Sequence, residues 1–172
     1  MEYPILEIAR YIGLTSIIKG LTISPLKLQK LLYYVQAWYM VFYGKGKVPF
    51  SDKPQAWVNG PVYPEVYYAY KDKTANMCDH LQASDFCEGA PEEAMRELAD
   101  RLHGLDFELL ESVILLYGSK SQNDLIFITH SETPWVEARE GLKPFERSNK
   151  ELSLDTMREY YKERHDRNMA KA

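Results

Sequence analysis

The stretch Lys27–Gly44, KLQKLLYYVQAWYMVFYG, decides the fold of this chain. After Lys30, only Gln36 interrupts its apolar and aromatic residues before the final glycine. Such a segment could span a membrane, form the central helix of a core, or offer an apolar face to a partner. A membrane span needs about 20 apolar residues, and lysines on both sides keep this run shorter. Exposing the segment costs about 25 cal/mol per Å² of apolar surface, so we assign most of it to a core.

Signals for the ends of a helix flank this stretch. Ser24 can cap the start, Pro25 suits the first helical position, and Gly44 suits the position after the last turn. A helix that is apolar almost all round is usually enclosed by other elements. The sequence therefore predicts a central apolar helix over about residues 25–43, around which the rest of the chain packs.

The remaining segments predict a mainly α, compact single-domain helical bundle over residues 1–172. Apolar residues at helical spacing and cap signals place further helices at about residues 4–19, 64–70, 91–118 with a break near Gly104, 121–129, 133–141 and from 153 to about 161. Short extended runs on either side of a turn-like Ser51–Pro54 predict a small β-hairpin near residues 47–58. Residues 71–90 show no clear period and are expected to form a loop, and the tail at about 163–172 is expected to fray.

Composition narrows the class of protein. The 172 residues fit one domain, and 45% hydrophobic with 27% charged residues is a globular balance. The net charge of −4 argues against nucleic acid as a partner. Two cysteines make no disulfide framework and suit a reducing compartment, and the N-terminus carries no signal-peptide pattern. We therefore expect a cytoplasmic protein with no membrane association.

The chemistry-bearing residues form no recognisable catalytic or metal-binding pattern. Cys78, His80 and Cys87, with or without His103, lack the paired ligands of a zinc site, so an ordinary loop with two thiols is the favoured interpretation. No nucleophile signature surrounds either cysteine, and no two carboxylates are placed to act as acid and base. We expect no enzyme activity, no cofactor and no bound metal.

Two short stretches leave a choice between structure and function. His130, at the end of an apolar helix, either contacts a partner or acts as a proton-linked switch, or it bonds a free helix carbonyl and packs on Trp135. Trp57, Gly60 and Pro61 either border a recognition pocket, or they set a turn with Trp57 packed on the central helix. The structural interpretation is favoured in both cases.

Three segments together resemble the Panacea-domain family: KLQKLLYYVQAWYMVFYGK, AWVNGPVYPEVYYAYK and LIFITHSETPWVEARE, in this order and spacing. The resemblance extends from about Ile5 to Tyr161, and only residues 71–90 share no pattern with it. The positions that carry it, expected to be mostly structural, are Leu28, Gln29, Lys30, Leu31, Leu32, Tyr33, Tyr34 and Gln36, then Trp57, Gly60, Pro61 and Val62, and finally Thr129, His130, Pro134 and Trp135.

The resemblance implies a bacterial antitoxin or a related phage-associated protein. Such a protein would belong to a toxin–antitoxin system and neutralise a cognate toxin, encoded by a neighbouring gene, through direct protein–protein binding. Some relatives act as adaptors that deliver the toxin to a cellular protease, so that mechanism stays open. The alternative is a transcriptional or phage-associated regulatory protein that binds nucleic acid or another regulator.

A partner surface is expected where tyrosines reach the edge of the bundle. Tyrosine suits interfaces because it combines an apolar body with a polar tip and loses little rotamer entropy. Lys30 and Gln36 are expected to be polar edge positions of the central helix. The partner-binding residues that we expect are Lys30, Gln36, Tyr39, Tyr43, Tyr67 and Tyr68.

Overall fold

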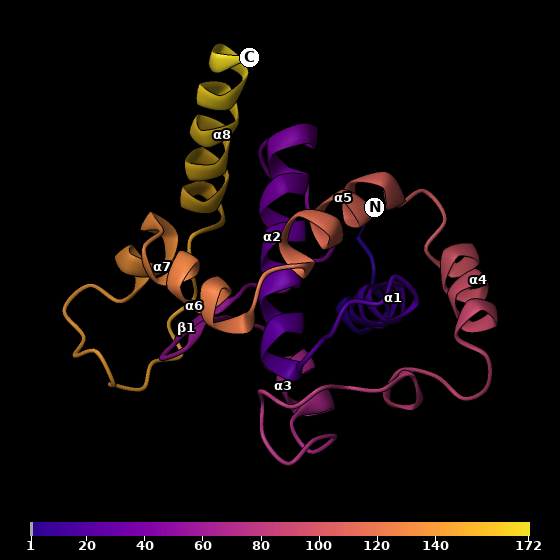
Figure 1. Ribbon diagram of the computed structural model, residues 1–172. Coiled ribbons are helices and arrows are strands. Elements are labelled where there is room, and N and C mark those ends of the chain that lie inside the picture. The colour runs from indigo at the N-terminus through magenta and orange to yellow at the C-terminus, as the bar shows by residue number, and fades with distance from the viewer. Residues whose placement is uncertain (1) are drawn as a thin grey trace.

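The computed structural model describes residues 2–172, and these residues are mainly helical, as the sequence predicts (Figure 1). The elements in chain order are α1 (Ile5–Ile18), α2 (Pro25–Tyr43), β1 (Gln55–Trp57), β2 (Gly60–Val62), α3 (Pro64–Tyr70), the short 3₁₀ helix η1 (Ala83–Asp85), α4 (Pro91–Arg101), α5 (Phe107–Gly118), α6 (Gln122–His130), α7 (Thr133–Ala138) and α8 (Leu154–Lys171). The predicted break near Gly104 separates α4 from α5.

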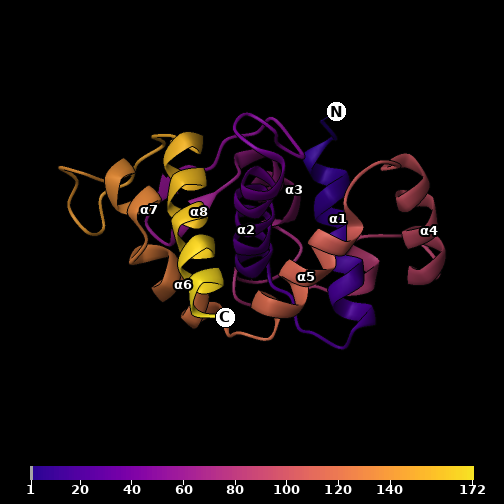
Figure 2. The ribbon, with the colours of Figure 1, turned by 90° about the horizontal axis from the view of Figure 1, so that it is seen from above.

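Helix α2 is the centre of the fold, which confirms the central helix predicted over residues 25–43. Seen from above, it lies between α8 on one side and α1 with α5 on the other (Figure 2). The Ser24 hydroxyl caps its first turn by accepting a hydrogen bond from Lys27 N at 3.1 Å. Only the last turn of α2 leaves large side chains exposed, at Phe42 and Tyr43.

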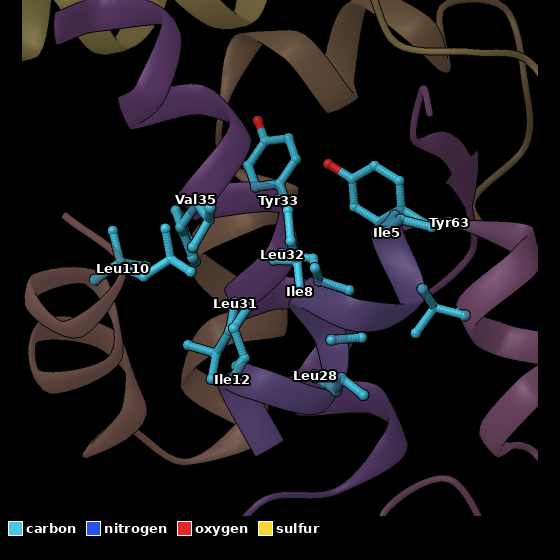
Figure 3. Packing of buried hydrophobic residues seen from close by; sticks show 14 of the residues in the cluster. Ile5, Ile8, Ile12, Leu28, Leu31, Leu32, Tyr33, Val35, Tyr63 and Leu110 are labelled. Carbon is cyan, nitrogen blue, oxygen red and sulfur yellow. The ribbon is translucent and has the colours of Figure 1, made fainter. Parts of the chain in front are cut away.

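The core is built around the middle of α2. Figure 3 shows Leu28, Leu31, Leu32 and Val35 of α2 packed between isoleucines of α1 and a leucine of α5. All four are fully buried. Burial stabilises the fold by about 25 cal/mol per Å² of apolar surface removed from water.

The predicted hairpin is present, but it lies over residues 55–62 rather than 47–58. Strands β1 and β2 are antiparallel, and Ala56 is opposite Pro61. Ala56 N donates to Lys150 O at 2.8 Å, so its N–H points away from β2. The pair Ala56 and Pro61 is therefore one that exchanges no hydrogen bonds, and Pro61, which has no N–H, fits there without the loss of a bond between the strands. Gly60, with φ of +104°, allows the tight reversal. We call residues 55–62 the motif hairpin.

The segment 71–90 forms turns and the short η1, and its backbone is tied to the core. Leu26 N donates to Met77 O at 3.0 Å, and Leu81 N donates to Ile23 O at 2.8 Å. At the other end of the chain, the tail that we expected to fray is helical as far as Lys171, because it continues α8. Most of its side chains are exposed.

Candidate partner-binding site

The motif hairpin is where the three family-like segments meet. The ammonium of Lys30, on α2, is fully buried and donates to the carbonyl of Pro61 at 3.1 Å. A Cβ at position 60 would lie 2.5 Å from Lys30 Nζ and 3.0 Å from the Thr129 hydroxyl of α6. The positive φ favours glycine at position 60, and a Cβ there would also force the buried end of Lys30 to shift.

Burial acts on two titratable groups beneath the hairpin. It lowers the pKa of Lys30 to about 7, and Lys30 forms no salt bridge within residues 2–172. It also lowers the pKa of His130, and the charge of Lys30 adds to this effect. The His130 ring stacks on Trp135 with centroids 4.0 Å apart and planes 11° apart. Both groups therefore favour their neutral forms more than in water.

Strand β1 of the hairpin is held by Trp135 of α7 and by Arg139, which directly follows this helix. Trp135 Nε1 donates to Trp57 O at 3.0 Å, and Arg139 Nη1 donates to Ala56 O at 2.8 Å. Arg139 Nη2 reaches on to Glu146 O at 2.7 Å. A single buried guanidinium thus fixes both β1 and the loop that follows α7.

Lys30 and Gln36 are not polar edge positions, so that expectation is wrong. Both are fully buried, because α2 is enclosed and the surrounding backbone carbonyls need donors. Gln36 Nε2 donates to Asp52 O at 2.7 Å, and Tyr63 donates its hydroxyl to Gln36 Oε1 at 2.8 Å. Gln29 Oε1 likewise accepts from Tyr63 N at 2.8 Å. These α2 side chains cannot contact a partner themselves, and they affect the surface only by fixing the backbone to which they are bonded.

The outer side of the motif hairpin borders an open groove of about 740 Å³, which we call the aromatic groove. Trp57 and Tyr67 pack edge to face, with centroids 4.8 Å apart, and Tyr68 is 65% exposed beside them. Trp57 lies outside the hydrophobic core, contrary to the expected packing on the central helix. The groove residues are Leu26, Trp57, Val58, Asn59, Val62, Tyr67, Tyr68, Lys71, Met77, Arg147, Ser148 and Asn149.

The six expected partner-binding residues fall into three places. Tyr67 and Tyr68 line the aromatic groove, whereas Lys30 and Gln36 lie inside the protein. Tyr39 and Tyr43 stack on each other at the far end of α2, with centroids 4.4 Å apart. The Tyr43 hydroxyl donates to Asp106 at 2.7 Å, and this bond raises the pKa of Tyr43 to about 12. The structure therefore brings only the pair on α3 to the groove.

Glu132, a buried carboxyl group within the third motif, was not among the expected site residues. It is 2% exposed and accepts a hydrogen bond from the hydroxyl of Tyr161 on α8, and Arg164 Nη1 lies 3.6 Å from its other oxygen. Burial raises the pKa of Glu132 to about 7, although the Tyr161 bond and Arg164 oppose the rise. Its position between His130 and Pro134 could have marked it as a candidate site residue. Its burial could not be predicted locally, because its partners Tyr161 and Arg164 come from α8.

Tyrosine side chains of α2, α5 and α8 form a cluster beside this carboxyl group. Tyr34 of α2 stacks on Tyr117 of α5 with centroids 3.7 Å apart, and both Tyr33 and Tyr34 pack edge to face on Tyr161. The hydroxyls of Tyr33 and Tyr34 are buried and have no hydrogen-bond partner within residues 2–172. The four tyrosines join α2, α5 and α8.

Residues 2–172 contain no group of three or more histidine, cysteine or acidic side chains that could hold a metal ion. Cys78 is exposed and Cys87 is half-buried, and both are free thiols. Within the same residues, no helix has both the length and the hydropathy that crossing a bilayer requires.

Comparison with known proteins gives one match. The family described as "Antitoxin SocA-like, Panacea domain" matches residues 28–136, which include α2 from Leu28 onward, the motif hairpin and the third motif as far as Val136. No curated protein and no solved structure matches the chain.

Proposed function

Because the chain belongs to the SocA-like antitoxin family with the Panacea domain, we propose that it neutralises a cognate protein toxin by binding it directly. The observation that carries this proposal is the aromatic groove on the motif hairpin. The family match spans residues 28–136, and these supply Trp57, Tyr67 and Tyr68 as well as the buried side chains beneath the hairpin.

The groove has the properties of a binding surface. Tryptophan and tyrosine are the residues that most often dominate the binding energy of protein interfaces. Its wall is also preorganised, because Trp135 and Arg139 hold the backbone of β1 and Lys30 holds that of β2. A wall that is already ordered loses less entropy on binding, so more of the contact energy appears as affinity.

Co-expression with the protein encoded by the neighbouring reading frame tests this function. We expect the chain to rescue growth from a toxic neighbour and to co-purify with it. The double variant Tyr67→Ala/Tyr68→Ala should lose both properties while keeping the thermal unfolding temperature of the unaltered chain within a few degrees. Phe127→Ala is the matched control, since this α6 side chain is 76% exposed and does not line the groove.

The same experiment separates the mechanisms. Rescue with a stable complex supports direct neutralisation, whereas toxin that disappears only while a cellular protease is active supports delivery to that protease. An unaltered chain that neither rescues nor co-purifies would contradict the proposed function. Salt-sensitive binding to its own promoter would then favour the regulator alternative.

A further inference from the structure

We propose that the aromatic groove receives an acidic segment of the toxin that carries a large apolar side chain. The apolar side chain would seat against Trp57 and Tyr67, and flanking carboxylates would meet Lys71 and Arg147. This inference rests on the proposed function, and it adds the chemistry of the segment that is bound.

The floor and walls of the groove suit an apolar anchor. Leu26, Val58, Val62 and Met77 line it together with the edge-to-face pair of Trp57 and Tyr67. A volume of about 740 Å³ is in the range of sites that enclose a group of several side chains' size. A phenylalanine, leucine or tryptophan side chain of a partner would bury its apolar surface there.

The positive charges at the groove favour a partner segment that is negatively charged. Its two charged lining residues are Lys71 and Arg147, and no aspartate or glutamate lines it among the described residues. Lys71 pairs with the exposed Asp72 at 2.8 Å, whereas Arg147 forms no salt bridge within residues 2–172. A guanidinium presents paired donors that match a carboxylate. Because the chain as a whole carries −4, an acidic segment would be repelled by most of the surface and attracted here.

Arg147 sits on a backbone that is fixed to the hairpin. Arg139 holds Glu146 O at 2.7 Å on one side, and Lys150 O accepts from Ala56 N at 2.8 Å on the other. The backbone that carries Arg147 is therefore held beside the aromatic wall, and the guanidinium lies within reach of a segment seated in the groove.

The test measures binding of the purified full-length chain to the purified toxin by calorimetry, together with short overlapping peptides that tile the toxin sequence. The affinity for toxin should fall as salt rises from about 50 to about 300 mM. The double variant Lys71→Glu/Arg147→Glu should bind about tenfold more weakly or worse. Lys47→Glu/Arg167→Glu is the matched control, because it makes the same charge change at exposed positions outside the groove. The tightest peptide should be acidic with a large apolar residue, and replacing its acids with lysine should restore binding to the reversed groove.

The outcomes separate the two proposals. If the unaltered chain binds the toxin and the groove variant binds equally well, the groove assignment is overturned while toxin neutralisation stands. A tightest peptide that is basic or purely polar overturns it in the same way. If the unaltered chain does not bind a toxin that it was expected to neutralise, both proposals fail together.

Discussion

Lys30 Nζ of α2 lies 3.1 Å from the carbonyl oxygen of Pro61 in β2, and this buried hydrogen bond joins the first family-like segment to the second. Thr129 of the third segment lies against the same place, since its hydroxyl would be 3.0 Å from a Cβ at position 60. The shape of the motif hairpin therefore depends on contacts between parts of the chain that are far apart in sequence.

Gly60→Ala should destabilise the protein more than a glycine substitution elsewhere. The positive φ alone costs about 1–2 kcal/mol for a residue with a side chain, and the new Cβ would also collide with Lys30 Nζ at 2.5 Å. Gly89→Ala is the matched control, because its φ is +85° but nothing lies within 4 Å of the new Cβ. Urea unfolding of both variants measures the difference, and equal losses would refute the packing against Lys30.

Glu132 should make the stability fall as the pH rises. Its pKa is about 7 in the folded protein and 4.5 as its ordinary value, so the folded state binds the proton more tightly. The stabilisation is complete below about pH 4.5 and is lost as the pH rises through about 7, for a total of about 3 kcal/mol. Glu132→Gln, which keeps an acceptor for Tyr161, should flatten this part of the profile. Urea unfolding between pH 4.5 and 8 checks it, and parallel profiles for the two proteins would be inconsistent with the buried carboxyl group.

Lys30 should make the stability rise with pH, opposite to the effect of Glu132, and it should do so at higher pH. Its pKa falls from 10.5 to about 7 on folding, so above pH 7 the unfolded chain binds the proton that the folded one has released. Stability from this group therefore rises with pH between about 7 and 10, by about 1 kcal/mol per pH unit. Lys30→Met should remove this rise, which is measured as the difference in unfolding free energy between the two proteins at pH 7, 8 and 9. A constant difference across this range would argue against the lowered pKa of Lys30.

Trp57→Ala should impair binding more than stability. The ring is half-buried and lies outside the core, so its removal should cost about 1–2 kcal/mol. Leu32→Ala, in the fully buried middle of α2, should cost about 2–5 kcal/mol. Thermal unfolding compares the two variants, and toxin binding should be lost in Trp57→Ala alone. A larger loss of stability at Trp57 than at Leu32 would place the ring in the core after all.

The central helix was predictable because its signals are local. Ser24, Pro25 and Gly44 are within one turn of the ends that they mark, and apolar residues fill the span between them. The cap signal at the start of α6 is equally local, since Ser121 and Asp124 form both bonds of a capping box.

The site was less predictable because its partners are distant in sequence. Lys30 and Gln36 look like interruptions of an apolar run, and only the folded chain places the carbonyls of Pro61 and Asp52 against them. The position of the hairpin also depends on a distant residue, because the carbonyl of Lys150 accepts the hydrogen bond from Ala56 N. The carboxyl group of Glu132 is bonded by Tyr161, which comes from α8 and is distant in sequence.

Toxin binding in the aromatic groove is tested most directly by hydrogen–deuterium exchange of the chain, alone and with its toxin. Toxin binding should slow exchange at the segments that line the aromatic groove, residues 57–62, 67–77 and 147–149. The other tyrosine pair, Tyr39 and Tyr43, provides an internal comparison at the far end of α2. Protection confined to residues 39–43 and their neighbours, with the groove segments unchanged, would contradict toxin binding in the aromatic groove.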